Sequence, residues 1–162
     1  MSLVVVGNVS DFDVNRQFVH HVLAMDTTNF GQPQGTGLDS AVMWRALTAT
    51  RLQTTVYVGI TIWELATAVV LIAALLSWVF ERRTCKRKAR NRSTIGLLMV
   101  VLLFFGGFID IGGEWFQMWR STVNNGLEPA FRNVMLAIAT LVLIHLPLPT
   151  SATDDQRNWV KP

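Results

Sequence analysis

The sequence predicts an all-α membrane protein: a four-helix transmembrane bundle whose first helix is truncated in this chain, with an extracytoplasmic segment that contains short helices. Apolar residues form 51% of the 162 residues and charged residues only 15%, which excludes a disordered chain. Three long apolar stretches are separated by polar segments, one of them strongly basic. The single cysteine, Cys85, excludes a disulfide scaffold. We therefore treat residues 1–162 as one integral membrane domain.

Residues 1–6 are predicted to end a first span. The apolar residues 3–6 are too few for a signal peptide and follow no basic leader. They fit either a buried strand-like plug or the last turn of a transmembrane helix that begins upstream of Met1. We favour the second interpretation.

Residues 7–51 are predicted to form the extracytoplasmic segment. A helix over residues 15–25 would place Val19, Val22 and Leu23 on one side. This spacing is typical of an amphipathic helix that lies at a membrane interface.

Three spans are predicted after this segment, over residues 52–80, 94–119 and 130–148. In the first of them, the 25 residues from 56 to 80 contain one charged side chain, Glu64. At 1.5 Å per helical residue this stretch reaches roughly 37 Å, enough to cross a hydrocarbon core of about 30 Å with some tilt.

The loop between the first two of these spans, residues 81–93, holds seven of the 14 Lys and Arg residues. Cytoplasmic loops accumulate such residues, so this loop is predicted to be cytoplasmic, the loop 120–129 to lie outside, and the tail 149–162 to be cytoplasmic. The charges would attract anionic lipid headgroups, by about 1 kcal/mol each near the surface. Nucleic acid is not expected as a partner, because the basic run is short and joined to the membrane at both ends.

Three acids in the spans, Glu64, Asp110 and Glu114, are the most informative residues, because charge inside a bilayer is costly. Under the predicted topology they lie at neighbouring depths in the outer half of the membrane, which predicts one polar cluster. Two interpretations are open: a structural ion-pair network, or a pathway for protons or cations. We favour the first, since the inner half of the spans is almost entirely apolar and a pathway would have to cross it. The arginines expected near this cluster include Arg45, Arg120 and Arg132.

Small residues accompany the acids on the second of these spans. Gly106, Asp110, Gly113 and Gln117 follow the spacing i, i+4, i+7, i+11 and would form one stripe on an α-helix. Glycines on a transmembrane helix let a neighbouring backbone come close, so helix packing is the predicted role of Gly106 and Gly113.

No catalytic, cofactor-binding or metal site is predicted. His20 and His21 are adjacent, so on a helix their side chains diverge by about 100° and cannot grip one metal without further ligands. The sequence has no Gly-rich phosphate loop, no Ser-His-Asp arrangement and no paired Cys motif.

Short motifs spread along the chain resemble a bacterial family of predicted small integral membrane proteins, a domain of unknown function. The matching pieces are FVHHVLAMDT at 18–27, MWRAL at 43–47, WELAT at 63–67 and GGEWFQMW at 112–119. Where the family pattern has Trp-Asn-Gly, this chain has Asn124 before Asn125 and Gly126. The resemblance implies four helices with both termini inside, and it implies no known activity.

Taken together, these features predict a non-enzymatic accessory or stabilising subunit of a larger bacterial membrane complex, for which a lipid-transport machine is one conceivable host. The alternative is a small proton-coupled transporter that uses the acidic cluster. The expected location is the inner membrane, with several spans and both termini cytoplasmic. The expected partners are membrane lipids and other integral membrane subunits.

Overall fold

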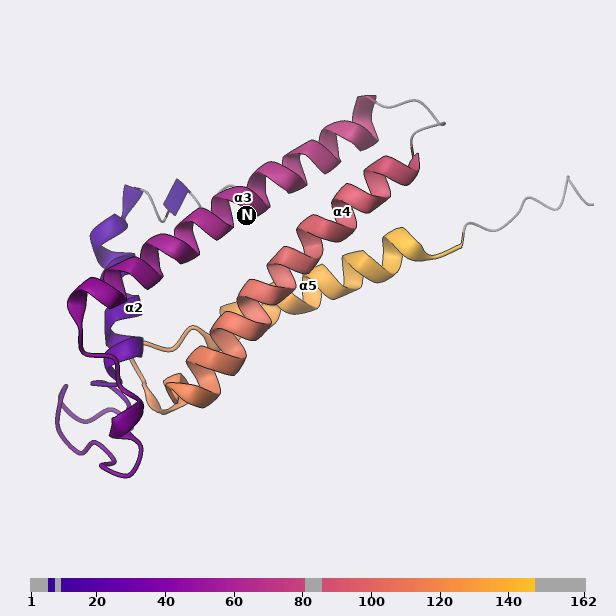
Figure 1. Cartoon of the computed structure of the whole chain (residues 1–162). Coiled ribbons are helices and arrows are strands. Elements are labelled where there is room, and N and C mark those ends of the chain that lie inside the picture. The colour runs from indigo at the N-terminus through magenta and orange to yellow at the C-terminus, as the bar shows by residue number, and fades with distance from the viewer. Residues whose placement is uncertain (1–5, 8–9, 81–85, 148–162) are drawn as a thin grey trace, which may run out of the picture.

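A computed structural model describes residues 6–7, 10–80 and 86–147. Three long helical rods run side by side, and the remaining described residues gather at one end of them as a cap (Figure 1). The elements, in chain order, are α2 (Phe12–Ala24), η1 (Met43–Arg45), α3 (Thr50–Phe80), α4 (Lys86–Val101), η3 (Leu102–Trp115), η4 (Met118–Arg120) and α5 (Leu127–His145). No strand occurs among these residues, so the described part of the fold is all-α, as predicted.

Three helices are long and apolar enough to cross a membrane: Thr50–Phe80, Arg87–Trp115 and Leu127–His145. They correspond to the three spans predicted over 52–80, 94–119 and 130–148. The predicted first span and the tail 149–162 lie outside the described residues, apart from Val6. A four-helix bundle thus stays a prediction, while three apolar helices are established.

The second rod starts earlier than predicted. Its helix α4 begins at Lys86, so Arg90 and Arg92 lie on its first turns and not in a loop. Arg92 donates a hydrogen bond to Ser77 Oγ, and Trp78 Nε1 donates to Ser93 Oγ at 3.0 Å. These contacts hold the basic start of α4 against the end of α3, which explains why the helix extends into the basic run.

The same rod changes its winding in the middle. From Leu102 to Trp115 the backbone follows the wider π pattern, in which an N–H bonds the carbonyl five residues earlier; the Phe116 N–H, for example, donates to Ile111 O at 3.0 Å. The helix ends at Trp115, and Gln117 has a left-handed backbone (φ 52°). The predicted stripe is therefore wrong: it assumed 3.6 residues per turn, and Gln117 lies outside the helix.

The core is divided between the cap and the rods. The predicted amphipathic helix is present as α2, whose Val19, Val22 and Leu23 pack in one cluster with Tyr57 and Phe116. A second cluster fills the space between α4, η3 and α5, with these buried members: Val100, Leu103, Phe104, Ala130, Val134 and Ala137. The cap is thus packed onto the rods near the end of η3, where the membrane acids lie.

Candidate functional site

The three membrane acids occupy two different environments. Glu64 on α3 is buried, with 2% of its surface exposed, whereas Asp110 and Glu114 on η3 are both exposed. Asp110 and Glu114 line one open hollow of about 430 Å³, together with Arg45, Ile111, Trp115 and Phe116; we call it the acidic hollow. The structure therefore brings together two of the three predicted acids at this hollow, and Glu64 is not among its lining residues.

Arg45 is the one predicted cation at the acidic hollow. Its guanidinium carbon lies 5.4 Å from the ring centre of Trp44 and 5.2 Å from that of Trp115, and its Nη1 donates to Trp115 O at 3.4 Å. Cation–π contacts of this kind hold a guanidinium by its face and leave its charge available at the edge. Among the described residues, neither Asp110 nor Glu114 forms an ion pair or a side-chain hydrogen bond, with Arg45 or with any other group.

The other two predicted cations lie elsewhere. Arg120 pairs with Asp39 at 3.2 Å, donates to Gln117 Oε1 at 2.7 Å and stacks over Phe30 at 5.0 Å, so it belongs to the cap. Arg132 is exposed in the second turn of α5. Among the described residues, the predicted ion-pair network is therefore not formed around Asp110 and Glu114.

The two predicted packing glycines differ from each other. A side-chain carbon added at Gly113 would come within 2.9 Å of Leu127 on α5, so the absence of a side chain there lets η3 and α5 approach. A carbon added at Gly106 would meet only Leu102 of its own helix, at 3.6 Å. Gly106 instead lines a second hollow, of about 370 Å³, beside Asp110 and Trp63. The helix surface around Asp110 is thus indented, with Trp63 of α3 at one hollow and Arg45 at the other.

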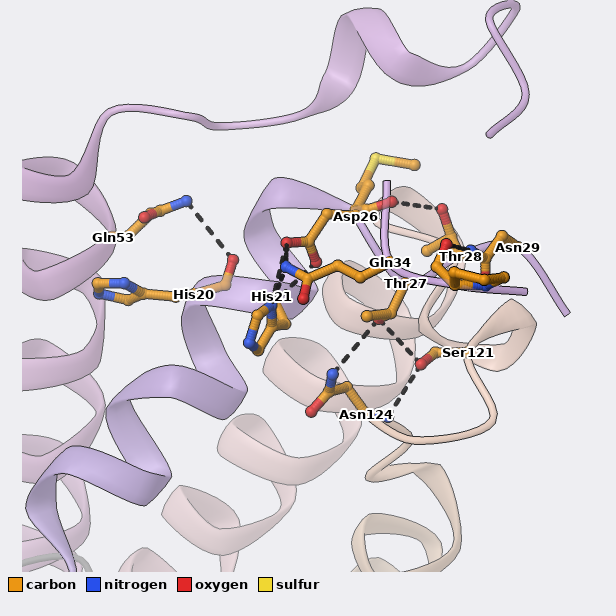
Figure 2. Close-up of polar contacts among 12 residues, drawn as sticks. His20, His21, Asp26, Thr27, Thr28, Asn29, Gln34, Gln53, Ser121 and Asn124 are labelled. Carbon is orange, nitrogen blue, oxygen red and sulfur yellow. Dashed lines mark hydrogen bonds and ion pairs between the residues drawn. The ribbon is translucent and has the colours of Figure 1, made fainter. Parts of the chain in front are cut away.

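The cap contains a polar network that the sequence did not predict (Figure 2). The His21 ring lies 3.0 Å from the Asp26 carboxylate, to which Gln34 Nε2 also donates at 2.6 Å. Ser121 donates to Thr27 Oγ1 at 3.0 Å and so joins the loop after α2 to the loop before α5. The sequence signal in this region is the run 30–39, whose four Gly and Pro residues are typical of a loop but do not indicate its partners.

Asn29 organises the long loop of the cap. Its side-chain amide donates to the carbonyls of Gln32, Pro33 and Thr36, at 3.0, 2.9 and 2.9 Å, and the residue is 3% exposed. The side-chain amide of Asn29 is thus a shared hydrogen-bond donor for three backbone carbonyls. In a helix or a sheet, backbone N–H groups would supply these hydrogen bonds.

His20 lies in a perturbed environment where the cap meets the rods. Its Nε2 lies 3.3 Å from Thr54 Oγ1, at the junction of α2 and α3. Burial lowers the pKa of His20, and the positive charge of Arg16 and the neighbouring His21 lower it further. His20 is therefore neutral near pH 7 and suited to hydrogen bonding between the two helices.

Within residues 6–7, 10–80 and 86–147, no group of three His, Cys, Asp or Glu side chains is placed to hold a metal ion. The acidic hollow has carboxylates but no nucleophile beside a base. What it offers is two acids and a tryptophan on the side of a membrane helix, with the arginine of η1 beside them, a combination suited to recognition.

Comparison with known proteins agrees with this description. No curated protein and no solved structure matches the chain. Residues 1–147 match the family described as predicted small integral membrane protein, DUF2165. The match covers nearly the whole chain, and it fits three apolar helices that each expose most of their surface. The chain therefore belongs to this family of small integral membrane proteins.

Proposed function

We propose that the protein is a non-enzymatic accessory subunit of a larger bacterial membrane complex and that the acidic hollow is its contact surface for another membrane subunit. The observation that carries this proposal is the exposure of Asp110 and Glu114 on a membrane-spanning helix. An aspartate costs about 2.5–3.5 kcal/mol at the bilayer centre on insertion scales, and less toward the interface. Such residues normally face other protein or water, so a second helix over the hollow would remove the cost.

The chemistry of the hollow suggests the partner. Two carboxylates outnumber the one guanidinium of Arg45, and that guanidinium is held by two tryptophan rings. A transmembrane helix with a Lys or Arg at the depth of Asp110 would complete the charge balance. The indentation at Gly106 would let this helix approach closely.

Co-purification from mild detergent tests the proposal. Asp110→Asn combined with Glu114→Gln should abolish the association with the partner subunit and leave the fold intact. Glu128→Gln is the matched control, because Glu128 is an exposed acid at the same end of the rods, in the first turn of α5. The proposal would be contradicted if the unsubstituted protein, the double variant and the Glu128→Gln control all retained the same partner.

Crosslinking gives a second, independent measure. A photoreactive residue at Ile111, 53% exposed in the acidic hollow, should crosslink to the partner. The same residue at Val69, 58% exposed on α3 and away from the hollow, should label lipid only. Partner crosslinks at Val69 alone would place the contact on α3 and contradict the proposal.

A proton-coupled carrier is the second candidate, because Asp110 and Glu114 lie in a membrane-spanning helix and lack ion-pair partners within the described chain. The same double variant separates the two roles. Normal association with lost proton flux in reconstituted vesicles would favour the carrier.

We further propose the inner membrane as the location, with the cap outside and the basic start of α4 in the cytoplasm. Cysteines at Gly35 and Asn125, in a Cys85→Ser background, should react with an impermeant thiol reagent in intact cells, and a cysteine at Arg90 should not. Labelling of Arg90 alone would invert this orientation.

A further inference from the structure

A half-open apolar cavity of about 240 Å³ lies between the cap helix and the rods. Its walls come from α2, α3, η3 and the start of η4, and among the lining residues are Val22, Leu23, Ile60, Gly107, Phe108 and Ile111. No lining residue has a polar side chain. Water needs two to four polar partners to be stable in a cavity, and apolar cavities of about 150 Å³ are known to stay dry and to admit apolar molecules.

The cavity reaches the membrane-facing surface at Ile111. This residue is 53% exposed, and it lines the apolar cavity, the acidic hollow and the hollow beside Gly106. Nearby positions on the same rod, Leu102 and Phe105, are 60% and 55% exposed. On one side of Ile111 the rod thus exposes apolar side chains to the bilayer, and on the other side lie the acids of the acidic hollow.

A missing side chain keeps the cavity open. A carbon added at Gly107 would meet only Leu103 Cδ1, at 3.8 Å, so the space in front of Gly107 is free. A larger side chain at this position would occupy the cavity itself. Empty apolar space is unfavourable because the atoms around it lose dispersion contacts, and an apolar occupant would restore these contacts.

We propose that this cavity is a binding site for one acyl chain of a membrane lipid, which enters beside Ile111 and lies under α2. The occupant follows from the surroundings: only 28% of the most apolar part of the Arg87–Trp115 helix is buried, so acyl chains are the apolar groups present at the opening. The site takes a hydrocarbon chain of any headgroup class, because its walls offer no hydrogen bond. This inference does not depend on the proposed role of the acidic hollow.

Photolabelling in vesicles tests the site. The full chain is reconstituted in phosphatidylethanolamine and phosphatidylglycerol vesicles that contain phosphatidylethanolamine with a diazirine on one acyl chain. Val22 and Leu23 are only 9% and 7% exposed, so lipid that merely surrounds the protein cannot reach them. After irradiation we expect adducts on these two residues, identified by peptide mass spectrometry. Adducts confined to exposed residues such as Leu102 would overturn the proposal.

Substitution of the glycine provides the second arm. Gly107→Leu should reduce labelling of Val22 and Leu23 by roughly tenfold, equivalent to about 1.4 kcal/mol of binding. Gly59→Leu is the matched control, because Gly59 is an exposed helical glycine with no atom near its missing side chain; it should leave the labelling unchanged. If Gly107→Leu does not fold, Gly107→Ala takes its place. Its side chain fits without displacing Leu103, and it should reduce the labelling of Val22 and Leu23 by less than Gly107→Leu would. Unchanged labelling in every folded Gly107 variant would show that the label reaches α2 by another route and overturn the proposal.

Discussion

The cap and the acidic hollow treat their polar groups in opposite ways. In the cap, the Asn29 amide donates hydrogen bonds to three backbone carbonyls, Ser121 joins two loops, and Arg120 contacts an acid and two aromatic rings. In the acidic hollow, a few residues away on η3, two carboxylates have no ion pair or side-chain hydrogen bond among the described residues. The polar groups of the cap are therefore satisfied within the chain, whereas the two carboxylates of the acidic hollow are left for a contact with another molecule.

The sharpest test on the cap side is Asn29→Ala. It removes the side-chain amide that donates to the carbonyls of Gln32, Pro33 and Thr36, from a residue that is 3% exposed. We expect a loss of about 2 kcal/mol in the free energy of unfolding, because each of the two amide hydrogens makes hydrogen bonding worth about 1 kcal/mol. Chemical unfolding in mixed micelles measures this change, and hydrogen exchange should localise the loosening to residues 30–37. An unchanged exchange pattern would show that the loop is held by something else.

A smaller effect is expected for Arg120→Ala. The variant loses the ion pair to Asp39, the bond to Gln117 and the stacking over Phe30. It also removes a buried Arg120 Nε that has no hydrogen-bond partner among the described residues, which offsets part of the loss. The net cost should be about 1 kcal/mol in the same unfolding assay. Arg120→Lys keeps the charge without the planar group, so a smaller loss in Lys than in Ala would assign the effect to the charge.

The pH dependence of stability should show a still smaller effect through His20. Its pKa in the folded protein is lowered by burial and by the charges of Arg16 and His21, so the unfolded chain binds the proton more readily. The free energy of unfolding should thus decrease as the pH falls below about 6.5, the ordinary histidine pKa, and level off below the lowered value. His20→Gln should keep a hydrogen bond to Thr54 and remove this component, so that the two pH curves diverge below pH 6.5. Parallel curves would assign the pH dependence to other groups.

The sequence predicted the rods much better than the site. Apolar length defines a transmembrane helix through the thickness of the bilayer, so the three described spans could be placed without any knowledge of contacts. The acids were found because charge in a span is costly, and Arg45 because it was expected near them at the outer interface. Their grouping was predicted only in part: Asp110 and Glu114 share the acidic hollow, but Glu64 does not line it, and the side of the rod that each acid faces depends on how η3 is wound. The wide turns from Leu102 to Trp115 change which side chains share a face, and hydropathy contains no signal for them.

The cap escaped prediction for a different reason. Its polar contacts connect residues that are distant in the sequence, such as Thr27 with Ser121 and Asp39 with Arg120. Local spacing describes partners one or two helical turns apart and gives no information on pairs of this kind. The helix α2 was predictable because its apolar residues recur at helical spacing, whereas the loop that follows it is organised by the single side chain of Asn29.

The smallest effect is predicted for the acids themselves, in the isolated protein. Asp110 and Glu114 are exposed in the fold and have no partner among the described residues, so Asp110→Asn combined with Glu114→Gln should change the free energy of unfolding by less than about 0.5 kcal/mol. Glu64→Gln is the matched comparison, because Glu64 is a buried acid of a neighbouring rod and should lose about 1 kcal/mol through weakened interactions inside the protein. The difference in the free energy of unfolding distinguishes an acid that stabilises the fold from two acids whose role is contact with another subunit. If the double variant lost as much stability as Glu64→Gln, the acidic hollow would be satisfied within this chain, and its exposure would no longer argue for a partner.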